Sequence, residues 1–151
     1  MNSTEFKNWK LKEVAKDVEI IALDSIARRD ELLIELNLPQ ADNLQRHRQE
    51  TSIDWSKMPT YHKFFFDREG LEDRIKHWFE KSILSNYGNV IITYGWKEPM
   101  IKVSTKLFFD DWEGFIRSTL WETVIFSEDY QLVMEVSRDY YLHSNFKIQD
   151  A

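Results

Sequence analysis

The stretch Phe126–Phe146, FSEDYQLVMEVSRDYYLHSNF, decides the predicted fold. It is rich in β-branched and aromatic residues and is broken by short polar segments such as SED, a pattern typical of strands joined by tight turns. It predicts a strand over 130–137 that forms a hairpin with a strand over 121–126, and a last strand over 140–148. This sheet end also carries four carboxylates against one Arg, a charge that calls for an explanation.

A second hairpin is predicted upstream of this stretch. NVIITYGW, residues 89–96, reads as a strand, and MIKVSTKLFF, residues 100–109, reads as its partner after the turn KEP. Between the two hairpins, DDWEGFIRS, residues 110–118, predicts a short helix. Asp110 is its expected N-cap, and Glu113 stands at the third helical position, where it can complete a capping box.

Helices are predicted for the first half of the chain. Apolar side chains at three- and four-residue steps predict a long helix over 4–37, and its length also allows a break near Asp24–Asp30. A short helix is expected over 42–50, and the clearest helix over 67–84, with Asp67 as its cap. Residues 51–66, which mix polar and aromatic side chains around a proline, are expected to form an irregular loop.

The order of these elements predicts an α+β fold. In it, N-terminal helices pack on a mostly antiparallel C-terminal sheet of about five strands with one short inserted helix. We find no internal repeat, low-complexity tract or linker in the sequence. Residues 1–151 are therefore expected to form a single domain.

The amino-acid composition restricts the cellular compartment and the kinds of functional site that the chain can contain. Apolar residues make up 42% and aromatic residues 15% of the 151 residues, so the chain can bury a sizeable core. Cysteine is absent, which excludes disulfides, Cys-ligated zinc, iron–sulfur clusters and a Cys nucleophile, and fits a reducing compartment. The first twenty residues are charged throughout, and no apolar run is as long as a membrane span. We expect a cytoplasmic protein with no membrane partner.

The net charge of −6 is concentrated in one window. Residues 108–139 contain eight acids and two bases, a balance of −6, whereas the rest of the chain has 18 of each. An acidic chain is a poor match for the phosphate backbone, so no nucleic-acid partner is expected. Every acid in the window has an ordinary explanation at a helix start, in a turn or, for Glu135, on an outward strand face. Solvated surfaces usually mix the two signs, however, and this contrast favours an acidic binding surface.

The residues predicted to contact a partner are seven of the eight acids of this window, all except Glu122, together with two neighbouring aromatic side chains as anchors. They are Asp110, Asp111, Trp112, Glu113, Glu128, Asp129, Tyr130, Glu135 and Asp139. No EF-hand spacing, His-Glu-x-x-His, Gly-x-Ser-x-Gly or Gly-rich phosphate loop occurs in the sequence. No metal, cofactor or catalytic residue is therefore predicted.

Three functional hypotheses follow. The first is an inhibitor or immunity-type protein that blocks a basic partner, such as a nuclease toxin, because a nuclease site must be basic to hold phosphate. The second is an enzyme with a nonstandard site near Tyr61, His62 and Asp67, which lie in or beside the irregular stretch. The third is a regulatory or structural subunit that pairs with another chain through its long N-terminal helix. The oligomeric state and the partner's identity stay open.

Overall fold

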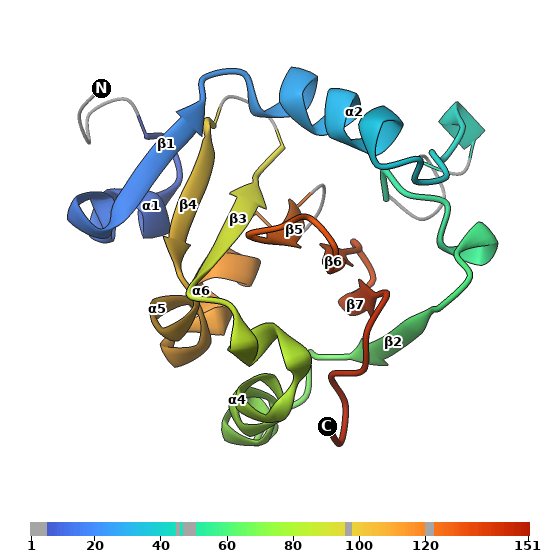
Figure 1. Ribbon diagram of the computed structural model, residues 1–151. Coiled ribbons are helices and arrows are strands. Elements are labelled where there is room, and N and C mark those ends of the chain that lie inside the picture. The colour runs from blue at the N-terminus through green and yellow to red at the C-terminus, as the bar shows by residue number, and fades with distance from the viewer. Residues whose placement is uncertain (1–5, 45, 47–50, 96–97, 120–122) are drawn as a thin grey trace.

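Seven strands form one antiparallel sheet in the order β1-β4-β3-β5-β6-β7-β2 (Figure 1). The structure, a computed structural model, describes residues 6–44, 46, 51–95, 98–119 and 123–151. The α+β class and the antiparallel pairing are confirmed, but the strands exceed the five predicted. They are β1 Val18–Ala22, β2 His62–Phe65, β3 Asn89–Thr93, β4 Met100–Ser104, β5 Thr123–Ser127, β6 Val133–Val136 and β7 Tyr141–Ser144.

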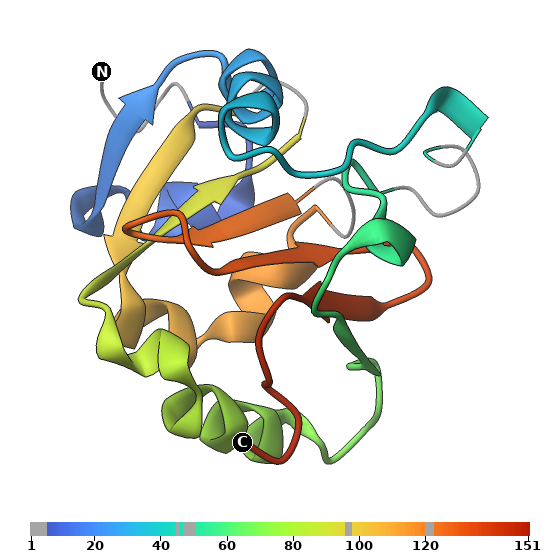
Figure 2. The ribbon, with the colours of Figure 1, turned by 45° about the vertical axis from the view of Figure 1, so that its right-hand side comes forward.

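Helices cover both faces of the sheet, and Figure 2 shows α2 and α4 on opposite sides of it. One core cluster joins α1, α4, α5 and α6 to the sheet, and a second joins α2 and the segment after it to the other face. In the described residues the α-helices are α1 Trp9–Glu13, α2 Ser25–Glu35, α4 Glu72–Lys81, α5 Thr105–Asp110 and α6 Trp112–Arg117.

The central strands are buried on both faces. In β5, Val124 and Phe126 face the α2 side, whereas Ile125 faces the opposite cluster, and all five residues of the strand are buried. A strand covered on both faces reads as a continuous apolar run. This explains why the sequence predicts strands at β3 and β5 although they lack a polar face.

The prediction of a long N-terminal helix over 4–37 is wrong, because this region forms α1, β1 and α2. Asn8 caps α1 by accepting hydrogen bonds from two backbone N–H groups, and Asp24 caps α2 by accepting from the N–H of Ala27 at 3.0 Å. Between them, β1 pairs with β4 at the edge of the sheet. The β-branched run of β1 prefers extended backbone, and long-range pairing outweighs the helical spacing of its apolar residues.

Three further predictions differ from the structure. The expected loop 51–66 contains β2, which pairs with β7 at the other edge of the sheet. The helix predicted to begin at Asp67 is α4, which begins only at Glu72. Before it lies a turn in which Gly70 has a φ of +83°, a conformation that favours glycine. The strand predicted over 100–109 changes to α5 at Thr105, because the Ser104 hydroxyl accepts from the N–H of Leu107 at 3.1 Å and caps a helix.

The hairpin predicted between 121–126 and 130–137 is confirmed as β5 and β6, and the predicted last strand is β7, which pairs with β6. The turns at the two ends of β6 repeat one motif, Ser-x-Asp-Tyr, over 127–130 and 137–140. In each turn the serine hydroxyl donates to the aspartate, and the tyrosine N–H donates to the serine carbonyl. Tyr130 and Tyr140 adopt left-handed backbone with φ of 63° and 66°, which is uncommon for an aromatic residue. This geometry resembles a type I turn closed by a left-handed residue, one of the common hairpin connections.

Some predictions fall on residues that the structure does not describe. The helix predicted over 42–50 lies largely outside the described residues, as do Trp121 and Glu122 at the start of the strand predicted over 121–126. In the described part of the chain, no helix has both the length and the apolar character needed to cross a membrane.

Candidate functional site

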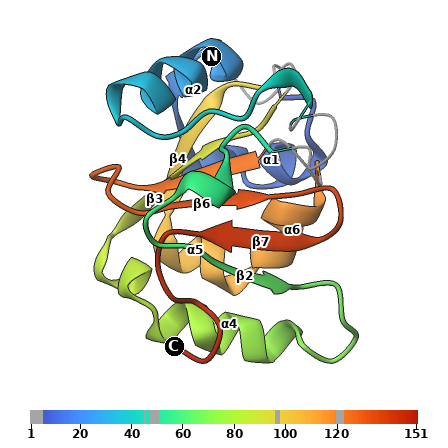
Figure 3. The ribbon, with the colours of Figure 1, turned by 90° about the vertical axis from the view of Figure 1, so that its right-hand side faces the viewer.

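A buried carboxylate holds the segment that follows α2 against the sheet. We call residues 51–61 the cover segment; Figure 3 shows the segment after α2 passing over β6 and β7. Glu135 of β6 is 0% exposed. It accepts hydrogen bonds from the backbone N–H of Ser52 at 2.6 Å and of Ile53 at 3.2 Å, and from Nε1 of Trp55 at 3.0 Å. The outward orientation predicted for Glu135 is therefore wrong, because the cover segment closes that face of the strand.

The carboxyl group of Glu135 titrates near neutral pH. Burial raises the pKa of its carboxyl to about 7, while the three N–H donors and the positive charge of Arg29 act in the opposite direction. Arg29 is itself buried on α2, and its Nη2 lies 3.3 Å from Asp30. Hydrogen bonds from three N–H donors favour the ionised carboxylate and lower its pKa. Desolvation is therefore the effect that raises the pKa of Glu135 to about 7.

Three stacked rings lie beside this carboxylate. His143 of β7 is the cross-strand neighbour of Glu135. Its ring stacks with Tyr61 and Trp55 at centroid distances of 5.8 and 5.7 Å, and the rings of Trp55 and Tyr61 lie 5.6 Å apart. Burial lowers the pKa of His143 to about 4, so the imidazole is neutral at neutral pH.

A chain of hydrogen bonds runs from Tyr61 through His143 to the Ser137–Asp139 turn. The distances are 2.8 Å from Tyr61 Oη to His143 Nδ1 and 2.9 Å from His143 Nε2 to Ser137 Oγ. Ser137 donates its hydroxyl hydrogen to Asp139, which as a carboxylate only accepts. The imidazole must then donate from Nε2 to Ser137 and accept at Nδ1 from Tyr61, which burial keeps protonated by raising its pKa. A serine nucleophile needs the reverse order, with its hydroxyl donating to the histidine.

The three residues named in the enzyme hypothesis lie in different environments. Tyr61 belongs to the hydrogen-bonded chain, whereas His62 is exposed on β2 at the edge of the sheet. Asp67 pairs with Arg117 of α6 at 2.8 Å. Among the described residues there is no group of three or more His, Asp or Glu side chains placed to hold a metal ion.

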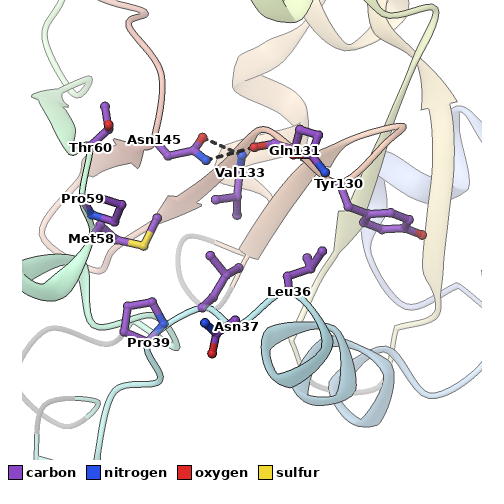
Figure 4. Close-up of a pocket in the computed structure, with 11 residues that line it drawn as sticks. Leu36, Asn37, Pro39, Met58, Pro59, Thr60, Tyr130, Gln131, Val133 and Asn145 are labelled. Atoms are coloured by element: carbon purple, nitrogen blue, oxygen red, sulfur yellow. Dashed lines mark hydrogen bonds between the residues drawn. The ribbon is translucent and has the colours of Figure 1, made fainter.

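A pocket of about 320 Å³ lies next to the cover segment (Figure 4). It is bounded by the carboxyl end of α2, by residues 58–60 and by the turn between β5 and β6. The side chains of Met58 and Val133 point toward it in Figure 4, and none of its lining residues is charged. An uncharged pocket of mixed polarity does not favour phosphate or metal ions.

Among the ion pairs of the described residues, four of the seven predicted acidic contact residues take part, and three of these four pair with lysines from outside the window. The lysines come from α1, α4, β4 and α5, so the charge imbalance along the sequence is partly compensated in space. Glu122 lies outside the described residues. The pairs are Asp110 with Lys76 at 3.2 Å and Lys106 at 2.8 Å, Asp111 with Lys10, Glu113 with Arg117 at 3.5 Å, and Glu128 with Lys102 at 3.5 Å.

The two predicted anchors have different environments. Trp112 is 3% exposed in the core, and its Nε1 donates to the carbonyl of Glu72 at 3.2 Å, so it offers no ring to a partner. Tyr130 is partly exposed, packs against Phe126 at a centroid distance of 5.5 Å and lines the pocket.

Two predicted acids stand together on an exposed turn, which we call the acidic tip: Glu128 and Asp129 between β5 and β6. Oδ2 of Asp129 accepts from the hydroxyl of Tyr87 at 2.8 Å, and its Oδ1 accepts from Ser127 Oγ at 2.7 Å and from a backbone N–H. Glu128 accepts from the side chain of Asn89 at 3.2 Å. The structure thus presents two carboxylates in defined positions at one end of the sheet.

Sequence reasoning missed Ser52, Trp55, Ser137 and His143. The first two bind Glu135 from about eighty positions away, a separation that leaves no local signal in the sequence. The repeated Ser-x-Asp-Tyr motif was a usable signal for the turns, because Ser and Asp side chains hydrogen-bond within tight turns.

Comparison with known proteins does not assign the chain to a family. No protein-family model matches it, and no match is found among curated proteins. The function is therefore inferred from the geometry described above.

Proposed function

We propose that this chain is a binding protein of the inhibitor or immunity type, which blocks a basic partner through its acidic tip and has no catalytic role of its own. The observation that carries the proposal is the fixed position of the carboxylates of Glu128 and Asp129. Each is held by a side chain from outside its own turn, and both remain exposed. Carboxylates that are already ordered lose little conformational entropy on binding a Lys or Arg.

The wider charge distribution supports a basic partner. The chain carries a net charge of −6, which attracts cationic proteins over distance and repels nucleic acid. A nuclease is a fitting partner class, because its phosphate-binding site must itself be basic. The absence of cysteine favours a reducing compartment, so we place the protein in the cytoplasm as part of the same proposal.

The two alternative hypotheses have less support. The subunit hypothesis needed one long N-terminal helix, and that part of the chain forms α1, β1 and α2 instead. The enzyme hypothesis needed an activated group near Tyr61. The hydrogen-bond order at Ser137 opposes nucleophilic attack, and His143, with its pKa lowered to about 4, is a weak base.

The test is a pull-down from native lysate at low and high salt with charge-reversed variants. Wild type should retain a basic protein at low salt and lose it at high salt. The double variant Glu128→Lys, Asp129→Lys should not retain it. The matched control Glu69→Lys, Asp73→Lys makes the same charge change before and within the first turn of α4 and should retain it. Equal retention by both double variants would overturn the role of the acidic tip.

A further inference from the structure

The pocket beside the acidic tip is preformed. The side-chain amide of Asn145 donates to the carbonyl of Gln131 at 3.0 Å, and its oxygen accepts from the N–H of Val133 at 2.9 Å (Figure 4). These bonds fix one wall of the pocket to the end of β6. Asn37, with a φ of 55°, ends α2 in a left-handed cap and shapes the opposite wall.

The third wall is held by the buried carboxylate. Residues 58–60 belong to the cover segment, which Glu135 binds through Ser52, Ile53 and Trp55. The pocket therefore does not depend on a ligand to form. Binding in a preformed pocket avoids the free energy needed to order its walls.

The lining indicates what the pocket can hold. Thr60 and Gln131 contribute neutral polar groups, while Met58, Pro59 and Tyr130 contribute apolar or aromatic surface. The volume of about 320 Å³ is near the lower end of the roughly 300–1,000 Å³ typical of ligand sites, which suits one large side chain. Methionine sulfur and aromatic rings make favourable contacts, so an aromatic occupant fits best.

The pocket and the acidic tip share one turn. Tyr130 and Gln131 line the pocket and directly follow Glu128 and Asp129 in the chain. We infer that the pocket receives an aromatic side chain of the basic partner, whose flanking lysines or arginines meet the two carboxylates. This arrangement, a desolvated aromatic anchor beside a charged rim, is the common plan of protein interfaces. The inference rests on the proposed function for the identity of the occupant as part of a basic protein.

Three blocked tripeptides test the inference by amide NMR titration of the full chain. They are acetyl-Lys-Phe-Lys-amide, acetyl-Lys-Ala-Lys-amide and acetyl-Ser-Phe-Ser-amide. The first should shift the amide signals of Met58, Thr60 and Gln131 in a saturable way. The alanine peptide should bind about tenfold more weakly, because it leaves the phenyl ring's apolar area unburied.

Two variants separate the pocket from the acidic tip. Thr60→Trp places an indole at an exposed position of the pocket lining. It should weaken the binding of the two Phe peptides about tenfold and leave the binding of the alanine peptide unchanged. The double variant Glu128→Lys, Asp129→Lys should weaken the binding of the two lysine peptides and leave the binding of the serine peptide unchanged. If the Phe and Ala lysine peptides bind equally and the pocket signals do not move, the pocket inference is overturned and the acidic tip stands. If acetyl-Ser-Phe-Ser-amide binds as well as the lysine peptide, the pocket stands and the acidic tip fails.

Discussion

Replacing Glu135 with Gln should change how the stability of the protein depends on pH. The folded protein binds a proton at Glu135 with a pKa of about 7, against an ordinary value of 4.5. Between these two values the folded state holds a proton that the unfolded chain has released. Raising the pH therefore favours unfolding, and the stabilising contribution of this group is lost as pH rises through 7. Gln does not titrate, so the variant should lose this slope.

The magnitude follows from the two pKa values. Between pH 5 and pH 8, the ionisation of Glu135 should lower the free energy of unfolding of wild type by about 2–3 kcal/mol, with most of the loss below pH 7. His143 acts with the opposite sign, because its pKa of about 4 lies below the ordinary 6.5 and its contribution is lost as pH falls through that range. The two groups offset each other in wild type, so the difference between variant and wild type is the informative quantity.

The variant also changes the hydrogen bonds at the cover segment. The Gln oxygen can replace Oε1, which accepts from Ile53 and Trp55, but its NH₂ group then faces the N–H of Ser52. An unpaired buried donor costs about 1–3 kcal/mol. We expect Glu135→Gln to be less stable than wild type at pH 5, and the gap to close or reverse by pH 8.

Urea denaturation followed by tryptophan fluorescence at pH 5, 6, 7 and 8 measures this difference. Glu69→Gln, which changes an exposed carboxyl, serves as the matched control and should follow wild type at every pH. Parallel stability curves for Glu135→Gln and wild type would refute the reasoning, since they would mean that the buried carboxyl does not titrate between pH 5 and pH 8.

Two further predictions concern the hydrogen-bonded chain and the cap of α2. Tyr61→Phe removes the donor to His143 Nδ1 but keeps the ring stack, so it should lower the free energy of unfolding by about 0.5–1.5 kcal/mol. Urea denaturation measures this loss, and an unchanged midpoint would show that the hydrogen bond contributes nothing. Asn37→Gly places the residue that favours left-handed backbone at a φ of 55° and should raise stability by about 0.4–1 kcal/mol. Calorimetry should show a melting temperature a few degrees higher, and a lower one would contradict the assigned cap.

Local signals were sufficient for much of the fold. Periodicity, turn residues and β-branched runs predict the α+β class, the β5–β6 hairpin, the last strand β7 and the core of α4, because each depends on residues close together in the chain. The acidic tip was also predicted as a solvated turn, and its two carboxylates are exposed on that turn.

Long-range contacts decided what the sequence by itself did not. The strand character of β1 and β2 depends on pairing with β4 and β7, and apolar spacing alone did not separate β1 from a helix. The partial compensation of the acidic window depends on lysines such as Lys10, which contacts Asp111 from 101 positions away in the sequence. Glu135 looks like an outward strand residue in the sequence, and it is buried because a segment about eighty residues upstream folds over it. Burial and ion pairing are properties of the assembled tertiary structure, so no local pattern in the chain records them.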